Sequence, residues 1–140
     1  MDIPILSGSN LSGSNRCLAV IAAANGFLAV SLGAFAAHGL QAHVSSALLP
    51  TWHTGVRYHM FHVLAALIAI VLVKFGGASR ASRWAALAGW LFLAGILLFC
   101  GSLYLLVLAP QPWLVMTAPL GGTLFLLGWV ALTGSLLSNK

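Results

Sequence analysis

Four long apolar runs, separated by short polar segments, make up most of this chain. They cover residues 17–37, 57–75, 84–109 and 113–137. An α-helix rises about 1.5 Å per residue, so about 20 apolar residues cross a hydrocarbon core of about 30 Å. The pattern therefore predicts an all-α fold: an integral membrane four-helix bundle of up-down-up-down topology, formed by one domain over residues 16–140.

The second run is apolar without interruption only over residues 63–73, which is short for a crossing. Its outer turns must therefore carry polar side chains. Pro50 suits the first turn of a helix, because proline has no N–H to leave unpaired there. We expect a helix from Pro50 that projects into the outer interface, with Trp52 and Tyr58 at headgroup level.

The fourth run contains a proline, Pro119, near its start. One interpretation is that the helix begins at Pro119, with residues 113–118 forming an interfacial lead-in. The alternative is a longer helix kinked at this residue.

The first fifteen residues are polar and contain the segment LSGSN twice in succession. Such a segment cannot bury apolar surface, so residues 1–15 are predicted to form a flexible cytoplasmic tail. Small residues at positions 34, 36 and 37 imitate a signal-peptide cleavage site. The preceding run of 21 residues exceeds the usual 7–15, however, and we expect an uncleaved first helix.

The chain has few charged residues, and the basic ones are unevenly distributed between the two ends of the predicted bundle. The chain has six basic residues and one acidic residue, with 61% hydrophobic residues and a mean hydropathy of +1.03. This composition is typical of membrane proteins, and it offers no basic stripe for nucleic acid. One side carries Arg16, Lys74, Arg80, Arg83 and Lys140, and the other carries only Arg57. Because basic residues stay on the cytoplasmic side, both termini are predicted to be cytoplasmic.

Small residues recur at helical spacing in three of the runs. Close approach of helices in lipid depends on such residues, because lipid supplies no strong hydrophobic drive between helices. The pattern predicts contact faces at the following glycines: Gly26, Gly33, Gly95, Gly121 and Gly128.

All five histidines lie between the first two runs or in the outer turns of the second. We expect His38, at the end of the first helix, to face His62 near the start of the second. The predicted polar cluster at this depth comprises His38, Tyr58, His62, Ser102 and Tyr104.

Three interpretations of this cluster are open. Its members could form structural hydrogen bonds between helices, which is the usual role of buried polar groups. A metal or haem iron could be bound by His38, His59 and His62, although the spacing alone is weak support. Transport or enzymatic proton transfer through His62 and Tyr58 is the third, and it is disfavoured because no Asp, Glu or Lys lies deep in a span.

Four ordered blocks resemble the family known as domain of unknown function 423. They are GAFAAHGL at residues 33–40, TGVRYHMFHVLA at 54–65, FCGSLYLL at 99–106 and TAPLGGTLFLLGW at 117–129. The resemblance covers residues 16–134 and implies a small four-helix protein of the bacterial inner (plasma) membrane. His38, Tyr58, His62, Ser102 and Tyr104 match the family pattern, as does the Gly121–Gly122 pair. Ala36, His59 and Cys100 depart from it.

These observations predict a multi-pass membrane protein with a non-catalytic role, as an accessory or assembly partner. A metal- or haem-binding protein is the alternative, and a small transporter or enzyme comes third. The sequence does not identify a cofactor, and we expect none. The expected partners are the lipid bilayer and other membrane proteins or a second copy, without nucleic acid.

Overall fold

The computed structural model describes residues 11–138, which contain helices and no strand. The long helices are α1 (Gly13–His38), α2 (Leu49–Gly76) and α5 (Leu114–Leu137), together with a rod of three joined segments. That rod consists of α3 (Arg80–Gly95), a π-helical turn η3 (Ile96–Cys100) and α4 (Gly101–Leu108). A 3₁₀ turn, η2 (Leu40–Ala42), follows α1.

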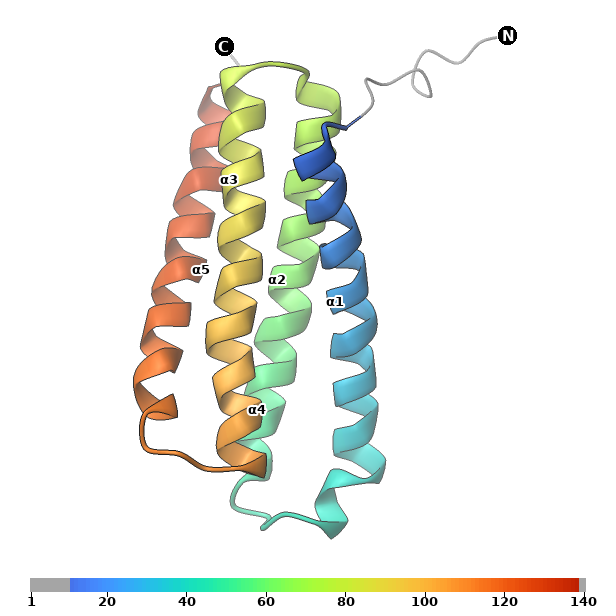
Figure 1. Cartoon of the computed structure of the whole chain (residues 1–140), viewed down its shortest axis with the longest axis vertical. Helices are drawn as coiled ribbons and strands as arrows, with labels where there is room; N and C mark the ends of the chain where they lie inside the picture. The colour runs from blue at the N-terminus through green and yellow to red at the C-terminus, as the bar shows by residue number, and fades with distance from the viewer. Residues whose placement is uncertain (1–10, 139–140) are drawn as a thin grey trace, which may run out of the picture.

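The four rods run alternately up and down, with α1 and α5 at opposite sides of the bundle (Figure 1). As a result, α1 begins at the same end of the molecule at which α5 ends. Each rod is long and apolar enough to cross a membrane. The predicted all-α, four-span membrane bundle is confirmed.

The first helix begins earlier than its apolar run. Ser12 is the N-cap of α1, and its hydroxyl accepts a hydrogen bond from the backbone N–H of Asn15. A side-chain oxygen at this position satisfies one of the unpaired N–H groups of the first turn. The predicted tail over residues 1–15 is therefore wrong for residues 13–15, and its residues 1–10 lie outside the described residues.

The second helix also begins before its apolar run, at Leu49, one residue before the expected start at Pro50. Pro50 lies in its first turn, as expected. Trp52 does not face the lipid interface, however, because its side chain is almost fully buried. At the other end, α2 stops at Gly77, whose φ of 58° is a left-handed conformation that glycine adopts without strain.

The fourth rod is one helix from Leu114 onward, with Pro119 inside it. The predicted lead-in over residues 113–118 is therefore wrong. Proline donates no hydrogen bond to the carbonyl four residues earlier, which belongs to Val115. The helix continues through this gap, and the hydroxyl of Thr123 donates to the Pro119 carbonyl.

The most extensive interface in the bundle joins α3 and α5, and glycines bring the two backbones together there. Gly121 lies against the backbone of Phe99, within the π-helical turn. Gly95 faces the Phe125 ring, and Gly128 faces the Phe92 ring. At each of the three positions, a Cβ atom would approach its neighbour more closely than van der Waals contact allows.

The interface between α1 and α2 is less tight. Gly33 lies opposite Val56 and Gly26 opposite Val63, where an added Cβ would sit 3.4 and 3.5 Å from the valine. Between these glycines and beyond them, the alanines of α1 that face the bundle are fully buried: Ala22, Ala29 and Ala36. All five glycines named from the sequence thus lie against a neighbouring helix.

Candidate functional site: two buried histidine clusters

Two of the five histidines are buried inside the bundle. His59 is 1% exposed and His62 is 6% exposed, although they lie less than one helical turn apart on α2. His38, His43 and His53 are exposed. The two buried rings point to different neighbours, so each forms the centre of its own cluster.

The His59 cluster consists of Asn25, Trp52, His59 and Tyr104, from α1, α2 and α4. The His59 Nε2 atom lies 3.2 Å from the Asn25 Oδ1 atom, and its Nδ1 atom lies 3.2 Å from the Tyr104 hydroxyl. Trp52 packs against Tyr104 with ring centroids 4.7 Å apart and ring planes tilted by 51°. Its indole N–H donates to the Leu32 carbonyl of α1 at 3.1 Å. The cluster thus fastens α1 to the rest of the bundle.

The partners of His59 fix where its proton lies. The Asn25 amide nitrogen donates to the Ile21 carbonyl at 2.9 Å, so the amide oxygen is the atom that faces His59. Because that oxygen can only accept, His59 carries its proton on Nε2. Nδ1 is then an acceptor, and the Tyr104 hydroxyl donates to it.

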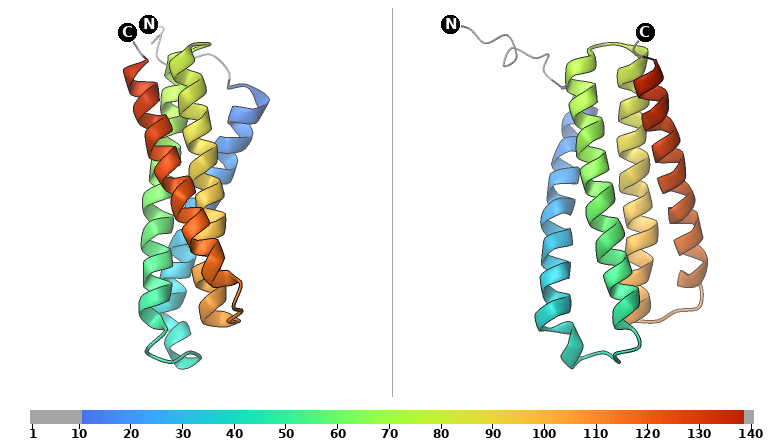
Figure 2. Two further views of the ribbon diagram at one scale, coloured as in Figure 1. Left: turned by 90° about the vertical axis from the view of Figure 1, so that its left-hand side faces the viewer. Right: turned by 180° about the vertical axis from the view of Figure 1, so that it is seen from behind.

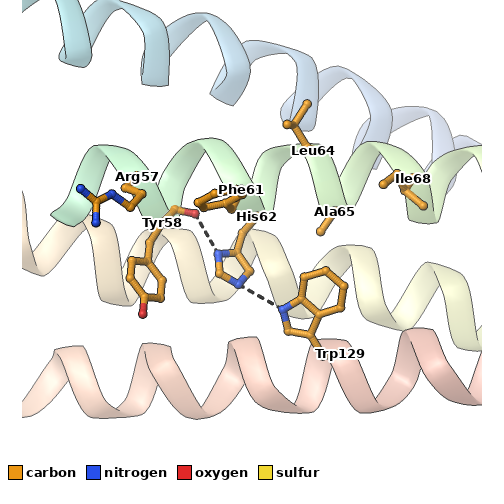
Figure 3. A pocket seen from close by; sticks show the side chains of 8 residues that line it. All are labelled: Arg57, Tyr58, Phe61, His62, Leu64, Ala65, Ile68 and Trp129. Atoms are coloured by element: carbon orange, nitrogen blue, oxygen red, sulfur yellow. Dashed lines mark hydrogen bonds between the residues drawn. The ribbon is translucent and has the colours of Figure 1, made fainter. Parts of the chain in front are cut away.

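The His62 cluster consists of Tyr58, His62, Phe92, Phe99, Phe125 and Trp129. The His62 ring lies on Phe125 with centroids 3.5 Å apart and planes at 9°. Its Nδ1 atom is 2.8 Å from the Tyr58 carbonyl, and its Nε2 atom is 3.3 Å from the Trp129 indole nitrogen (Figure 3). The cluster joins α2 to α3 and α5.

In this cluster the proton lies on the opposite nitrogen. A backbone carbonyl only accepts and an indole N–H only donates, so His62 has its proton on Nδ1 and accepts at Nε2. His62 is therefore neutral in this arrangement. A second proton on Nε2 would break the bond to Trp129.

The expectation that His38 and His62 face each other is wrong. His38 lies at the end of α1, beside the start of α2, and its side chain is exposed. His62 lies thirteen residues beyond Leu49, which is about 20 Å along the helix axis. Even from the expected start at Pro50, His62 lies twelve residues, or about three turns, into α2, which is too far from the end of α1 for the two rings to meet.

The other members of the predicted cluster are divided. Tyr104 belongs to the His59 cluster, and Tyr58 belongs to the His62 cluster. Ser102 is buried but donates to the Phe99 carbonyl of its own rod at 2.8 Å, so it joins neither histidine. The structure therefore replaces one predicted cluster with two.

Several residues of the two clusters were not predicted. Asn25 is the one amide within the first apolar run, and a polar residue at such depth is a signal for a buried partner. Trp52 was assigned to the interface. Nothing in the sequence marked Phe125 and Trp129 as partners of a histidine, because an aromatic residue within an apolar run can face either lipid or another helix.

The three histidines considered as metal ligands, His38, His59 and His62, do not meet at one place. Among residues 11–138, no group of three or more His, Cys, Asp or Glu side chains is placed to hold a metal ion. His59 and His62 each use both ring nitrogens for hydrogen bonds to protein groups. Within the same range, no buried side-chain nitrogen or oxygen lacks a hydrogen-bond partner.

A groove of about 540 Å³ opens next to the His62 cluster. Its lining comes from α2, except for Trp129 of α5 (Figure 3). Arg57 lies at one end of it and Ile68 at the other, with His62 and Trp129 between them. It is predominantly apolar, with few polar groups.

The fold and these buried clusters define a multi-pass, all-α membrane protein. Residues 32–122 match the model of the family described as protein of unknown function (DUF423), and the chain belongs to this family. The matched range includes both buried histidines.

Curated relatives support this assignment over most of the chain. The UPF0382 membrane protein YwdK of Bacillus subtilis is 43% identical over 112 residues, covering 79% of this chain and 88% of the relative. A UPF0382 membrane protein of Haemophilus influenzae is 43% identical over 127 residues, covering 90% and 97%. No solved structure matches the chain.

Proposed function

We propose that this protein is a non-catalytic accessory or assembly partner of a larger membrane system. The observation that carries the proposal is that His59 and His62 each use both ring nitrogens in hydrogen bonds between or within helices. Catalysis and proton transport need a titratable group that faces a substrate or a water-filled path. The buried polar groups here are instead engaged in holding the helices together.

The outer face of α1 is the surface that best suits a partner. In the most apolar 18-residue stretch of α1, 17% of the residues are buried, against 33–44% in the other three rods. Its exposed residues recur at steps of four and three, and several are small enough for another helix to approach closely. They are Ala23, Phe27, Val30, Ala34 and Ala37.

Photo-crosslinking in native membranes tests this proposal. A photoreactive residue at Phe27, which is 77% exposed, should form an adduct with a second membrane protein. Leu126 of α5, which is 69% exposed, is the matched control and should yield no such adduct. Adducts of equal yield at both positions, or none at Phe27, would contradict a docking face on α1.

We further propose the bacterial inner membrane as the location, with both termini cytoplasmic. Arg16, Lys74, Arg80 and Arg83 support this orientation, since they lie near the end of the bundle where α1 begins and α5 ends. Fused after Lys140, a reporter enzyme that works only in the cytoplasm should be active, and one that works only in the periplasm should be inactive. Activity of a periplasmic reporter at that position would overturn the orientation.

A further inference from the structure

The groove beside His62 exists because α2 and α5 both pack on α3 and leave a space between themselves. Seen from behind, α2 and α5 flank the α3 rod (Figure 2, right). The interfaces of α3 with α2 and with α5 are the two most extensive in the molecule. Phe61, Ile68 and Trp129 line the groove with apolar surface, and Arg57 closes one end.

The groove has the length of one membrane leaflet. Arg57 and Ile68 are eleven residues apart on α2, which is about 16 Å along the axis, or about half of a hydrocarbon core of about 30 Å. Lys74, near the other end of α2, lies about 26 Å from the level of Arg57. The two basic residues therefore bracket the hydrocarbon core, and the groove runs inward from the boundary marked by Arg57.

Arg57 has no counter-ion within the described part of the chain. Residues 11–138 contain no Asp or Glu, and Asp2 lies outside that range. The Arg57 side chain is exposed and makes no hydrogen bond to residues 11–138. A guanidinium at headgroup level attracts anionic lipid, and its geometry suits two oxygens of a phosphate.

We infer that the groove binds one acyl chain of an anionic phospholipid, whose phosphate is held by Arg57. The ligand combines the two chemistries that the groove offers, a leaflet-long apolar wall and an exposed cation at its outer end. An acyl chain is apolar and flexible enough to follow this wall, and it is much narrower than an α-helix, which is about 10 Å wide. The site lies in the leaflet opposite the end where α1 begins, and it does not rest on the proposed partner at α1.

Native mass spectrometry of the purified protein in detergent tests the inference, with graded additions of phosphatidylglycerol or phosphatidylcholine. The wild type should retain one phosphatidylglycerol more tightly than one phosphatidylcholine. Arg57→Gln should weaken retention of phosphatidylglycerol about fivefold and leave phosphatidylcholine unchanged. Arg83→Gln, which removes an exposed charge at the opposite end of α2 and α3, is the matched control and should match the wild type.

A second pair of variants tests the apolar part of the groove. Ile68→Trp adds a large side chain at a lining position that is half exposed, and it should reduce retention of both lipids. Leu126→Trp adds the same bulk on α5 outside the groove and should have no effect. Thermal unfolding in detergent checks that all four variants fold.

Three results would overturn the inference. The first is equal retention of the two lipids by the wild type, which indicates only an unselective lipid annulus. The second is retention of phosphatidylglycerol that Arg57→Gln leaves unchanged. The third is a protein dimer that Ile68→Trp dissociates, which identifies a second copy as the occupant.

Discussion

The two sides of the bundle are held together by different means. On the α5 side, Gly95, Gly121 and Gly128 bring α5 against α3, and at Gly121 the contact is with backbone. On the α1 side, the glycines leave ordinary van der Waals spacing, and a chain of polar side chains provides the link. Close packing needs no directional group, whereas a looser interface in lipid gains from hydrogen bonds.

The two buried histidines also differ in what their hydrogen-bond partners can do. The bonds of His59 end at Tyr104, whose hydroxyl can either donate or accept, and at an amide oxygen. Protonation of His59 would therefore keep both contacts after the hydroxyl turns. His62 bonds to Trp129, which can only donate, so that contact requires a neutral ring. The hydrogen bonds of His59 are thus compatible with either protonation state of the ring, whereas the bond from Trp129 to His62 is compatible only with the neutral ring.

The largest expected effect separates the glycines of the two interfaces. Gly121→Ala places a methyl group into the Phe99 backbone, which cannot move aside as a side chain can, and should cost about 1–3 kcal/mol. Gly26→Ala meets only Val63 at ordinary contact distance and should be neutral or stabilise by up to about 1 kcal/mol. Thermal unfolding in detergent measures both. A greater loss from Gly26→Ala would reverse the assignment of the tight interface.

Replacement of each histidine by leucine should give the next largest difference. His59→Leu leaves the Asn25 oxygen and the Tyr104 hydroxyl without their shared partner between the helices and should cost about 1–2 kcal/mol. His62→Leu should cost about half as much, because Trp129 is 46% exposed and the Tyr58 carbonyl remains within its helix. His59→Gln keeps a donor and an acceptor and should recover part of the loss. Equal melting temperatures for the two leucine variants would contradict this ranking.

A double-mutant cycle should isolate the link from α1. Asn25→Ala and His59→Leu remove the same hydrogen bond, so their effects on the free energy of unfolding should couple by about 0.6–1.7 kcal/mol. Ser31→Ala serves as the control, because the Ser31 hydroxyl donates to the Phe27 carbonyl of its own helix. Its effect should add to that of His59→Leu without coupling. A coupling no larger than that of Ser31 would show that the bond to Asn25 does not hold α1.

The smallest expected difference is the position of one proton. At neutral pH, ¹⁵N spectra of histidine-labelled protein in micelles should show His59 protonated on Nε2 and His62 on Nδ1. His59→Gln and His62→Gln assign the two signals. The same tautomer at both positions would refute the donor and acceptor roles assigned to the two rings.

The sequence by itself determined the fold class, because four long and predominantly apolar runs have few other solutions in a membrane. It also identified the glycines at which helices meet, since small residues at helical spacing mark such faces. The tertiary structure decided which of these glycines make the closest contacts between helices. Gly33 and Gly121 are alike in the sequence, but only Gly121 lies against another backbone.

The hydrogen-bond partners of the two buried histidines could be identified only from the tertiary structure. The sequence placed Tyr104 and His62 at a similar depth, but depth does not specify which neighbouring helix a ring faces. The three turns of α2 that precede His62 separate it from His38, and the rotation of α2 about its axis directs His59 to Asn25 and His62 to Trp129. Pairs of side chains from different helices are fixed by the packing of whole helices, and no local pattern in the chain encodes them.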